Sequence, residues 1–162
     1  MVFLIVSVVV LVGIDQLTKY LAIVHLSLDG PVNVIPSILN FIYVENRGAA
    51  FGILQDARWF FLVLALVGVG IIIWYILKRP HNLLLRSCLS LIAAGALGNA
   101  VDRLFRGFVV DFIQLDFIDF PVFNIADICI CVGAVLLAVY VLFFDKKEDN
   151  HDHSIADRDG SE

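Results

Sequence analysis

The chain has 162 residues, 60% of them hydrophobic, with a mean hydropathy of +0.93 and a formal net charge of −5. Soluble domains are roughly 45–50% apolar, so the composition excludes an ordinary soluble domain and indicates a membrane protein of one domain's length. Seven of the sixteen acidic residues follow Phe144, and the rest of the chain is close to neutral. Nothing in the charge therefore indicates a nucleic-acid partner.

Four apolar segments predict membrane-spanning helices, because about 20 apolar residues cover the ~30 Å hydrocarbon core of a bilayer. They lie at about residues 2–22, 58–77, 87–105 and 124–144. The first is fully apolar only as far as Ile14, so its helix must carry Asp15 and Lys19 into the membrane region. It has no basic start and no small-residue cleavage site, which favours a retained helix over a cleaved signal peptide.

The loops predict the orientation of these helices. Residues 78–86 contain three cationic residues and no acids, so this loop and both termini are expected on the cytoplasmic side. The longer loops, residues 23–57 and 106–123, then lie outside. Residues 1–144 are predicted to form one membrane domain, and residues 145–162 an acidic, disordered cytoplasmic tail.

The first of the long loops contains two local signals. Asp29, Gly30 and Pro31 predict a turn, and the β-branched and aromatic residues from Ile38 to Val44 predict a short strand. A loop this long in so small a protein is usually functional.

Asp15 and Lys19 lie four residues apart with the acid first, which favours an ion pair on one helix face. The pair either offsets its own burial or lets Lys19 reach a lipid head group or shape a site. On the third helix, one arc of about 100° collects polar and small residues. These are Gly95, Asn99, Asp102, Arg103 and Arg106.

Such a polar arc must face protein, water or a ligand at membrane depth. Asp102 can pair with Arg106. Arg103 either joins a structural network or presents its fork to a substrate carbonyl or phosphate. Gly95, with Ala96 and Gly98, permits close approach of another backbone.

Asp111 and Asp127 are carboxylates without an obvious cationic partner. The simplest interpretation makes Asp111 a solvated loop acid and Asp127 the acid of a helix cap that begins at Asn124. We expect the face of Asp127, which continues through Cys131, Ala134 and Ala138, to pack against other helices.

Brought together, the two carboxylates would share one proton, and one would activate water while the other protonates the reacting carbonyl or leaving nitrogen. That aspartic-protease chemistry needs no metal or cofactor. No Ser/His pair is apparent, and His25 is the only histidine expected outside, which argues against a histidine-ligated zinc.

Five motifs make the pattern specific. They are DQLTK at Asp15–Lys19, VENRGAAFGIL at Val44–Leu54, GALGNAVDR at Gly95–Arg103, GFVVDF at Gly107–Phe112 and FNIAD at Phe123–Asp127. In this order and spacing the chain resembles bacterial lipoprotein signal peptidase, also called signal peptidase II. Only the acidic tail lies outside the resemblance. The chain departs from the family pattern at Ala94, where a glycine is common, and in the missing basic start of the first helix.

The resemblance implies an all-α integral membrane protein with four transmembrane helices, whose first loop forms a small extracytoplasmic β-sheet cradle with a short helix. It implies an aspartyl endopeptidase of the bacterial cytoplasmic (inner) membrane, with both termini cytoplasmic. The implied substrates are prolipoproteins, cleaved just before the cysteine that carries a diacylglyceryl group. Globomycin-type cyclic peptides inhibit the family, and we expect a monomer in contact with membrane lipids.

The resemblance also implies roles for individual residues. Asp111 and Asp127 would be the catalytic pair. Substrate-positioning or supporting roles fall to Asn46, Asn99, Arg103, Asn124, Asp15, Lys19, Gly95 and Asp102. The alternative from another class is a small proton- or ion-coupled transporter, since intramembrane acids also mark ion paths. A transporter usually distributes its acids through the bilayer or carries inverted repeats, and neither feature is visible here.

Overall fold

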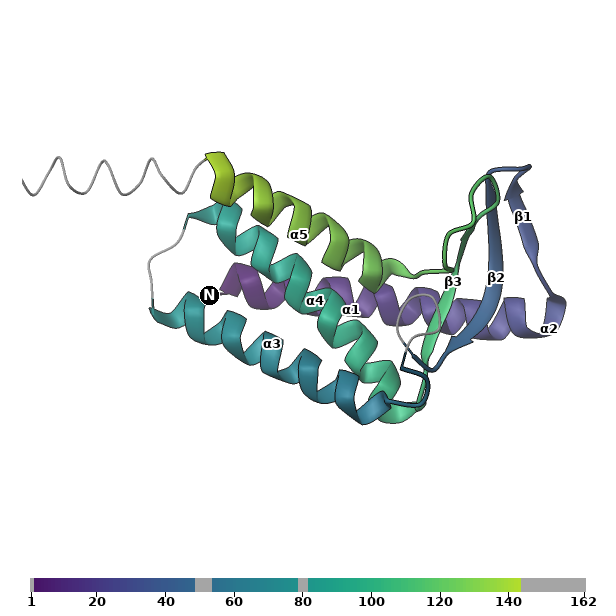
Figure 1. Ribbon diagram of the computed structural model, residues 1–162, viewed down its shortest axis with the longest axis horizontal. Coiled ribbons are helices and arrows are strands. Elements are labelled where there is room, and N and C mark those ends of the chain that lie inside the picture. The colour runs from purple at the N-terminus through teal and green to yellow at the C-terminus, as the bar shows by residue number, and fades with distance from the viewer. Residues whose placement is uncertain (1, 49–53, 79–81, 144–162) are drawn as a thin grey trace, which may run out of the picture.

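The computed structural model describes residues 2–48, 54–78 and 82–143 and consists of a helical bundle with a small sheet at one end (Figure 1). Within these ranges, four helical spans are long and apolar enough to cross a membrane. In chain order the elements are α1 (Val2–Leu21), the π-helical turn η1 (Ala22–Leu26), α2 (Ser27–Asp29), β1 (Val32–Ile35), β2 (Leu39–Asn46), α3 (Arg58–Lys78), α4 (Leu83–Phe105), β3 (Val109–Leu115) and α5 (Ile125–Phe143). The four predicted spans are thus confirmed, whereas the predicted tail lies outside the described residues.

Two helix boundaries differ from the prediction. The first helix continues beyond residue 22 through η1 and α2, and Gly30 ends it at φ 85°, a conformation that glycine adopts without strain. The short helix found in the first loop is therefore a direct continuation of α1. Helix α4 begins at Leu83 rather than at residue 87, because the Asn82 side chain caps it by accepting from the backbone N–H of Leu85 at 2.9 Å.

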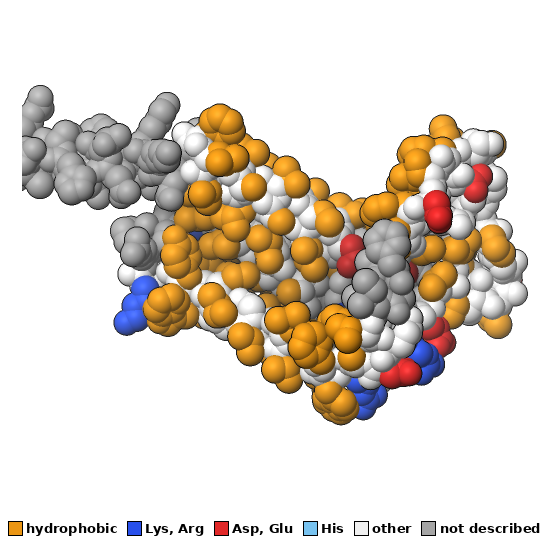
Figure 2. Space-filling view, in the orientation of Figure 1, with side chains coloured by type: hydrophobic (Ala, Val, Ile, Leu, Met, Phe, Trp, Pro, Cys, Tyr) orange, Lys and Arg blue, Asp and Glu red, His pale blue; other side chains and the backbone are white. Residues whose placement is uncertain are grey.

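Helix α4 lies at the centre of the bundle and contacts α1, α3 and α5. Small residues make the closest approach possible: a Cβ on Gly95 would collide with the backbone oxygen of Ala126 on α5. Helices α3 and α5 expose long apolar side chains over most of their surface. Figure 2 shows these apolar side chains over the helices, with Lys and Arg at the two ends of the bundle.

The sheet is antiparallel, in the order β1-β2-β3, and combines both long loops. The predicted strand at Ile38–Val44 corresponds to β2. The second long loop, residues 106–123, also contains a strand, β3, which was not predicted. Strand β3 is buried from Val109 to Ile113 on both faces, so it lacks the alternation that marks a half-exposed strand.

An apolar cluster attaches the sheet to the end of the first helix. Ala22 of η1 packs with Val110, Phe112 and Ile113 of β3, and Phe41 of β2 meets Phe112 edge-on with ring centroids 5.9 Å apart. The sheet is therefore fixed to the bundle at the level where α1, α4 and α5 bring their polar residues.

Candidate active site

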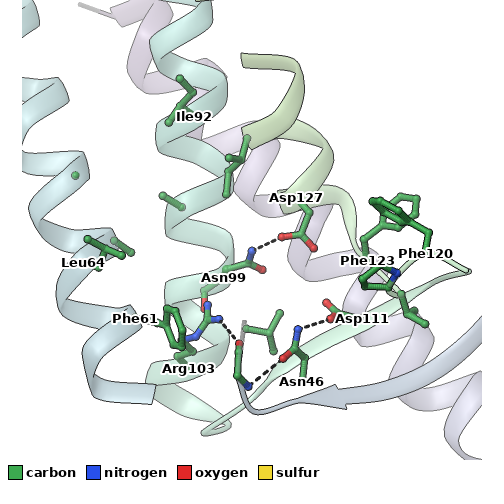
Figure 3. A pocket seen from close by; sticks show the side chains of 18 residues that line it. Asn46, Phe61, Leu64, Ile92, Asn99, Arg103, Asp111, Phe120, Phe123 and Asp127 are labelled. Atoms are coloured by element: carbon green, nitrogen blue, oxygen red, sulfur yellow. Dashed lines mark hydrogen bonds between the residues drawn. The ribbon is translucent and has the colours of Figure 1, made fainter. Parts of the chain in front are cut away.

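A cavity of about 480 Å³ lies between α3, α4, the start of α5 and the sheet (Figure 3). Its polar lining consists of Asn46, Asn99, Arg103, Asp111 and Asp127. The rest of its wall is apolar and includes Phe61, Leu64, Ala65, Ile92, Phe120 and Phe123. The sequence thus predicted the polar residues of one cavity, although they come from four separate elements.

Asp111 lies on β3 and is only 2% exposed, so the interpretation as a solvated loop acid is wrong. Its Oδ2 accepts from Asn46 Nδ2 at 2.9 Å, and its Oδ1 accepts from Asn124 Nδ2 at 2.6 Å. Burial raises the pKa of Asp111 to about 6, and the charge of Asp127 adds to the rise, while the two amide hydrogen bonds lower it. The predicted effect of desolvation is therefore present.

Asp127 lies in the first turn of α5, where it forms the predicted cap with Asn124. The Asp127 N–H donates to Asn124 Oδ1 at 3.0 Å, and the Asn124 N–H donates to Asp127 Oδ2 at 3.2 Å. The other carboxylate oxygen, Oδ1, accepts from Asn99 Nδ2 at 2.8 Å. Asp127 thus combines a capping role with a place on the cavity wall.

Asn124 connects the two carboxylates and is fully buried. Its Nδ2 donates to Asp111 Oδ1 and also to Asn99 Oδ1, at 3.2 Å. Its backbone N–H donates to Asp127 Oδ2, and its side-chain oxygen accepts from the Asp127 N–H. In Figure 3, the carboxylates of Asp111 and Asp127 point into the same space beside Asn99 and Asn46. The two predicted acids therefore share one amide network at the cavity.

Arg103 forms part of the cavity wall next to α3. Its Nη2 donates to the backbone oxygen of Gly48 at 3.2 Å, and its guanidinium carbon lies 4.8 Å from the ring centre of Phe61. These contacts hold the end of β2 against α3 and α4. The guanidinium also borders the cavity, so both predicted roles of Arg103, in a network and towards a ligand, are compatible with its position.

Lys19 lies behind this cavity in a cluster of charges. Its Nζ lies 2.9 Å from Asp15 Oδ2 and 3.1 Å from Asp102 Oδ2, and the opposite oxygen of Asp102 binds Arg106. Both predicted ion pairs are confirmed. Lys19 is 0% exposed, so the alternative that it reaches a lipid head group is wrong.

Two features of the site did not follow from the sequence. Gln16 joins the charge cluster, with Nε2 donating to Asp102 Oδ1 and to the Gly98 oxygen at 3.1 Å each. It lies within the DQLTK motif, but it was assigned no role there. The predicted packing face of α5 is also wrong. Cys131, Ala134 and Ala138 are exposed, and the packed face carries Ala126, Cys129 and Gly133. Asp127 itself meets Asn99 of α4 at the cavity, but the face that continues from it along α5 does not pack against another helix.

Cation ligands are sparse around the cavity. Within the described ranges, no group of three or more His, Cys, Asp or Glu side chains is arranged to hold a metal ion. The chemistry that the described cavity offers is that of two carboxylates, two amides and a guanidinium, with the amide of Asn124 buried behind the carboxylates.

Comparisons with known proteins agree with this architecture. A family model described as signal peptidase (SPase) II matches residues 7–143. Lipoprotein signal peptidases of two Streptococcus pyogenes strains, serotype M5 (strain Manfredo) and serotype M3 (strain ATCC BAA-595 / MGAS315), are each 42% identical over 134 residues, covering 82% of this chain and 88% of the relative.

Two solved structures, both described as a bacterial membrane enzyme, have the same fold. The one at 1.9 Å resolution is 36% identical with a TM-score of 0.80, covering 90% of this chain and 95% of the other. The one at 2.3 Å is 35% identical with a TM-score of 0.79, covering 88% of each chain. Since the family model spans all four helices and the sheet, the chain belongs to the signal peptidase II family and is an aspartic-type signal peptidase that crosses the membrane several times.

Proposed function

We propose that the protein removes signal peptides from diacylglyceryl-modified prolipoproteins, cleaving just before the lipidated cysteine, with Asp111 and Asp127 as the catalytic pair. Membership of the family and the names of its relatives support the activity. One observation carries the assignment of the residues: both carboxylates line the same cavity and are joined through Asn124.

The proposed chemistry uses one water molecule. One carboxylate takes a proton from the water, whose oxygen forms a bond to the carbonyl carbon of the residue before the cysteine. The other carboxyl group, which is protonated, donates its proton to the carbonyl oxygen. The first carboxyl group then gives the proton it took from the water to the leaving nitrogen as the C–N bond breaks, and the other carboxylate takes back a hydroxyl proton as the new carboxyl group of the product forms. The raised pKa of Asp111, caused by burial and by the charge of Asp127, favours a pair that holds one proton near neutral pH.

The apolar wall of the cavity supports a lipidated substrate. Phe61, Leu64 and Ala65 of α3 and Ile92 of α4 line it, and both helices are membrane spans. A diacylglyceryl group must remain in an apolar medium, so it can enter the cavity laterally from the bilayer, along this apolar wall. Asn46, Asn99, Arg103 and Asn124 would hold the peptide and the two aspartates, and a globomycin-type cyclic peptide would compete for the same space.

We propose that the sheet and the cavity lie on the extracytoplasmic side of the bacterial inner membrane. The N-terminal end of α1 and the C-terminal end of α5 lie at the opposite end of the bundle (Figure 1), together with Lys78 and Arg86. Cationic residues near the ends of spans favour the cytoplasmic side.

Cleavage of a diacylglyceryl-modified prolipoprotein by the purified protein in detergent, with a chelator present, tests the proposal. We expect activity that resists the chelator and falls by at least about 1,000-fold in Asp111→Asn and in Asp127→Asn, because each change removes an essential proton acceptor or donor. Each variant also loses one amide hydrogen bond, which costs only about 1 kcal/mol, so the protein is expected to remain folded.

The matched control is Asp119→Asn, because Asp119 is an exposed acid in the same connection between α4 and α5. It is expected to cleave at the wild-type rate. Near-normal turnover by either Asp111→Asn or Asp127→Asn would refute the catalytic pair, and loss of activity with the chelator would point to a metal held by carboxylates.

A further inference from the structure

We infer that Lys19 is a positioning residue that sets the geometry of Asp111 and Asp127, although its own hydrogen bonds go to other residues. Its expected effect on catalysis rests on the function proposed above. The inference itself rests on three hydrogen bonds of one buried ammonium group, each of which leads to one or both of the aspartates.

All three N–H donors of Lys19 are engaged. They go to Asp15 Oδ2 at 2.9 Å, Asp102 Oδ2 at 3.1 Å and Asn99 Oδ1 at 2.9 Å. An ammonium group has only three donors, and this one is 0% exposed. Lys19 therefore has no donor left for a substrate or a lipid, and its influence must pass through its three partners.

The two carboxylate partners hold the backbone immediately before each aspartate. Asp15 Oδ1 accepts from the N–H of Ala126 at 2.9 Å, one residue before Asp127. Asp102 Oδ2 accepts from the N–H of Val110 at 3.1 Å, one residue before Asp111. The ammonium group of Lys19 thus links α1, α4, the start of α5 and β3 at the backbone positions directly before the two aspartates.

The third partner, Asn99, is oriented by the chemistry of Lys19. Because an ammonium can only donate, it fixes the oxygen of the Asn99 amide towards itself, where Asn124 Nδ2 also donates. The Asn99 nitrogen is thereby left to donate to Asp127 Oδ1 at 2.8 Å. Lys19 therefore determines which end of the Asn99 amide faces the carboxylate of Asp127.

The charges of the cluster balance, which indicates that Lys19 fixes geometry and does not supply uncompensated positive charge to the site. Lys19 and Arg106 face Asp15 and Asp102, so the two cations match the two carboxylates. Buried ion pairs contribute little net stability against well-packed apolar residues, because desolvation offsets their attraction. A fixed arrangement of the attached backbone is a function that an apolar cluster could not supply, since it has no acceptor for the N–H groups of Val110 and Ala126.

Two variants test the inference: Lys19→Met and the charge-balanced double variant Lys19→Met/Asp15→Asn. Hydrogen–deuterium exchange is measured in detergent across the peptides that contain Val110 and Ala126, together with kcat and KM for the lipidated prolipoprotein. We expect about tenfold faster exchange at these two segments, because each loses the support of its acceptor. We also expect kcat to fall about 100-fold, as for a misplacement of reacting groups by about 1 Å, with KM changing by less than about threefold.

Arg106→Gln is the matched control. Arg106 belongs to the same cluster but binds Asp102 Oδ1 and, at 3.1 Å, Gln16 Oε1, so its loss leaves the three hydrogen bonds of Lys19 in place. We expect this variant to lose stability while kcat stays within about threefold of the wild type and exchange at the two segments is unchanged.

Unchanged exchange and unchanged kcat in folded Lys19 variants would overturn the inference. Faster exchange along the whole of α4 and α5 would also overturn it, because Lys19 would then only stabilise the bundle. The same conclusion follows if both Lys19 variants fail to fold while Arg106→Gln folds. If the wild type cleaves no prolipoprotein, the proposed function fails, but the exchange comparison still decides whether Lys19 holds the two segments.

Discussion

Asn46 donates from Nδ2 to Asp111 Oδ2 at 2.9 Å, reaching diagonally across the ladder from β2 to β3. The orientation of the Asn46 amide is fixed, because its Oδ1 accepts from the N–H of Gly48 at 3.0 Å. The hydrogen bond favours the ionised form of Asp111 and so opposes the effect of burial on its pKa. Asn46 is therefore placed to set the pH range in which the proposed catalytic pair would be active.

The variant Asn46→Ala is expected to raise the pKa of Asp111 above its value of about 6, because a hydrogen bond to the ionised form is lost. The limb of the pH profile of kcat/KM that reports Asp111 should move to higher pH, with about a tenfold change in activity on that limb. A series of kcat/KM values between about pH 4.5 and 9 measures the shift.

Asn40→Ala is the control for this change. Asn40 lies on the same strand and faces Gln114 of β3, away from the cavity. Its pH profile should match that of the wild type. Movement of the Asn46→Ala limb to lower pH would contradict the proposed effect on Asp111.

Asp111 is also expected to make stability depend on pH. Because burial raises its pKa from 3.8 to about 6, the folded protein binds this proton more tightly than the unfolded chain. The contribution of Asp111 to stability is complete below pH 3.8 and is lost as the pH rises through about 6. As the pH rises over this range, the free energy of unfolding of the wild type should therefore fall by about 3 kcal/mol relative to that of Asp111→Asn.

Thermal unfolding of both proteins in detergent, followed at several pH values, measures this difference. The altered hydrogen bonding of an asparagine at position 111 adds an offset that does not vary with pH, so only the slope is informative. Asn40→Ala, which removes no ionisable group, should show a constant difference from the wild type. A slope of the opposite sign would contradict the raised pKa.

Much of the fold follows from the sequence, because the length of an apolar segment directly reflects the thickness of a bilayer. The elements that were not predicted lack a local signal. Strand β1 is exposed throughout, and β3 is buried on both faces, so neither shows the alternation of a typical strand. The continuation of the first helix as far as Gly30 was not predicted either, because this segment contains the polar residues His25, Ser27 and Asp29.

The sequence predicts the residues of the site better than their surroundings and contacts. The motifs identified the five polar residues of the cavity, but the motifs alone gave no indication that Asp111 is buried in a sheet. The attachments of Lys19 to Asn99 and of Asp15 to Ala126 join positions 80 and 111 residues apart, so only the packed fold reveals them. The catalytic and supporting roles of these residues remain predictions.

Arg103→Lys is expected to weaken substrate binding. Lysine keeps the charge, but it cannot both donate to the Gly48 oxygen and stack on Phe61 with a planar group. We expect KM to rise about tenfold, with a smaller change in kcat, because the end of β2 is held less firmly beside the cavity. Steady-state kinetics with the lipidated prolipoprotein measures the two parameters separately.

Arg47→Lys is the matched control for Arg103→Lys. Arg47 also lies over an aromatic ring, with its guanidinium carbon 5.5 Å from the ring centre of Phe108, but its side chain is 54% exposed and pairs with Glu45. Its KM should be that of the wild type. An equal rise in KM for both variants would show that losing any arginine at this end of the molecule has the same effect.

Gly95→Ala is expected to disturb the contact between α4 and α5 that sets Asn99 of α4 against Asp127 of α5. A Cβ at this position would collide with the backbone oxygen of Ala126 and lie 2.7 Å from Ile130 Cγ1, so α5 must move away from α4. Overpacking of this kind costs about 1–3 kcal/mol, and a displaced Asp127 should lower kcat as well.

Gly70→Ala on α3 is the control, because no atom lies within 4 Å of its added Cβ, and alanine favours a helix by up to about 1 kcal/mol. Thermal unfolding in detergent should therefore show a lower midpoint for Gly95→Ala and an equal or higher one for Gly70→Ala, and equal midpoints for the two would show that α4 and α5 can separate at no cost.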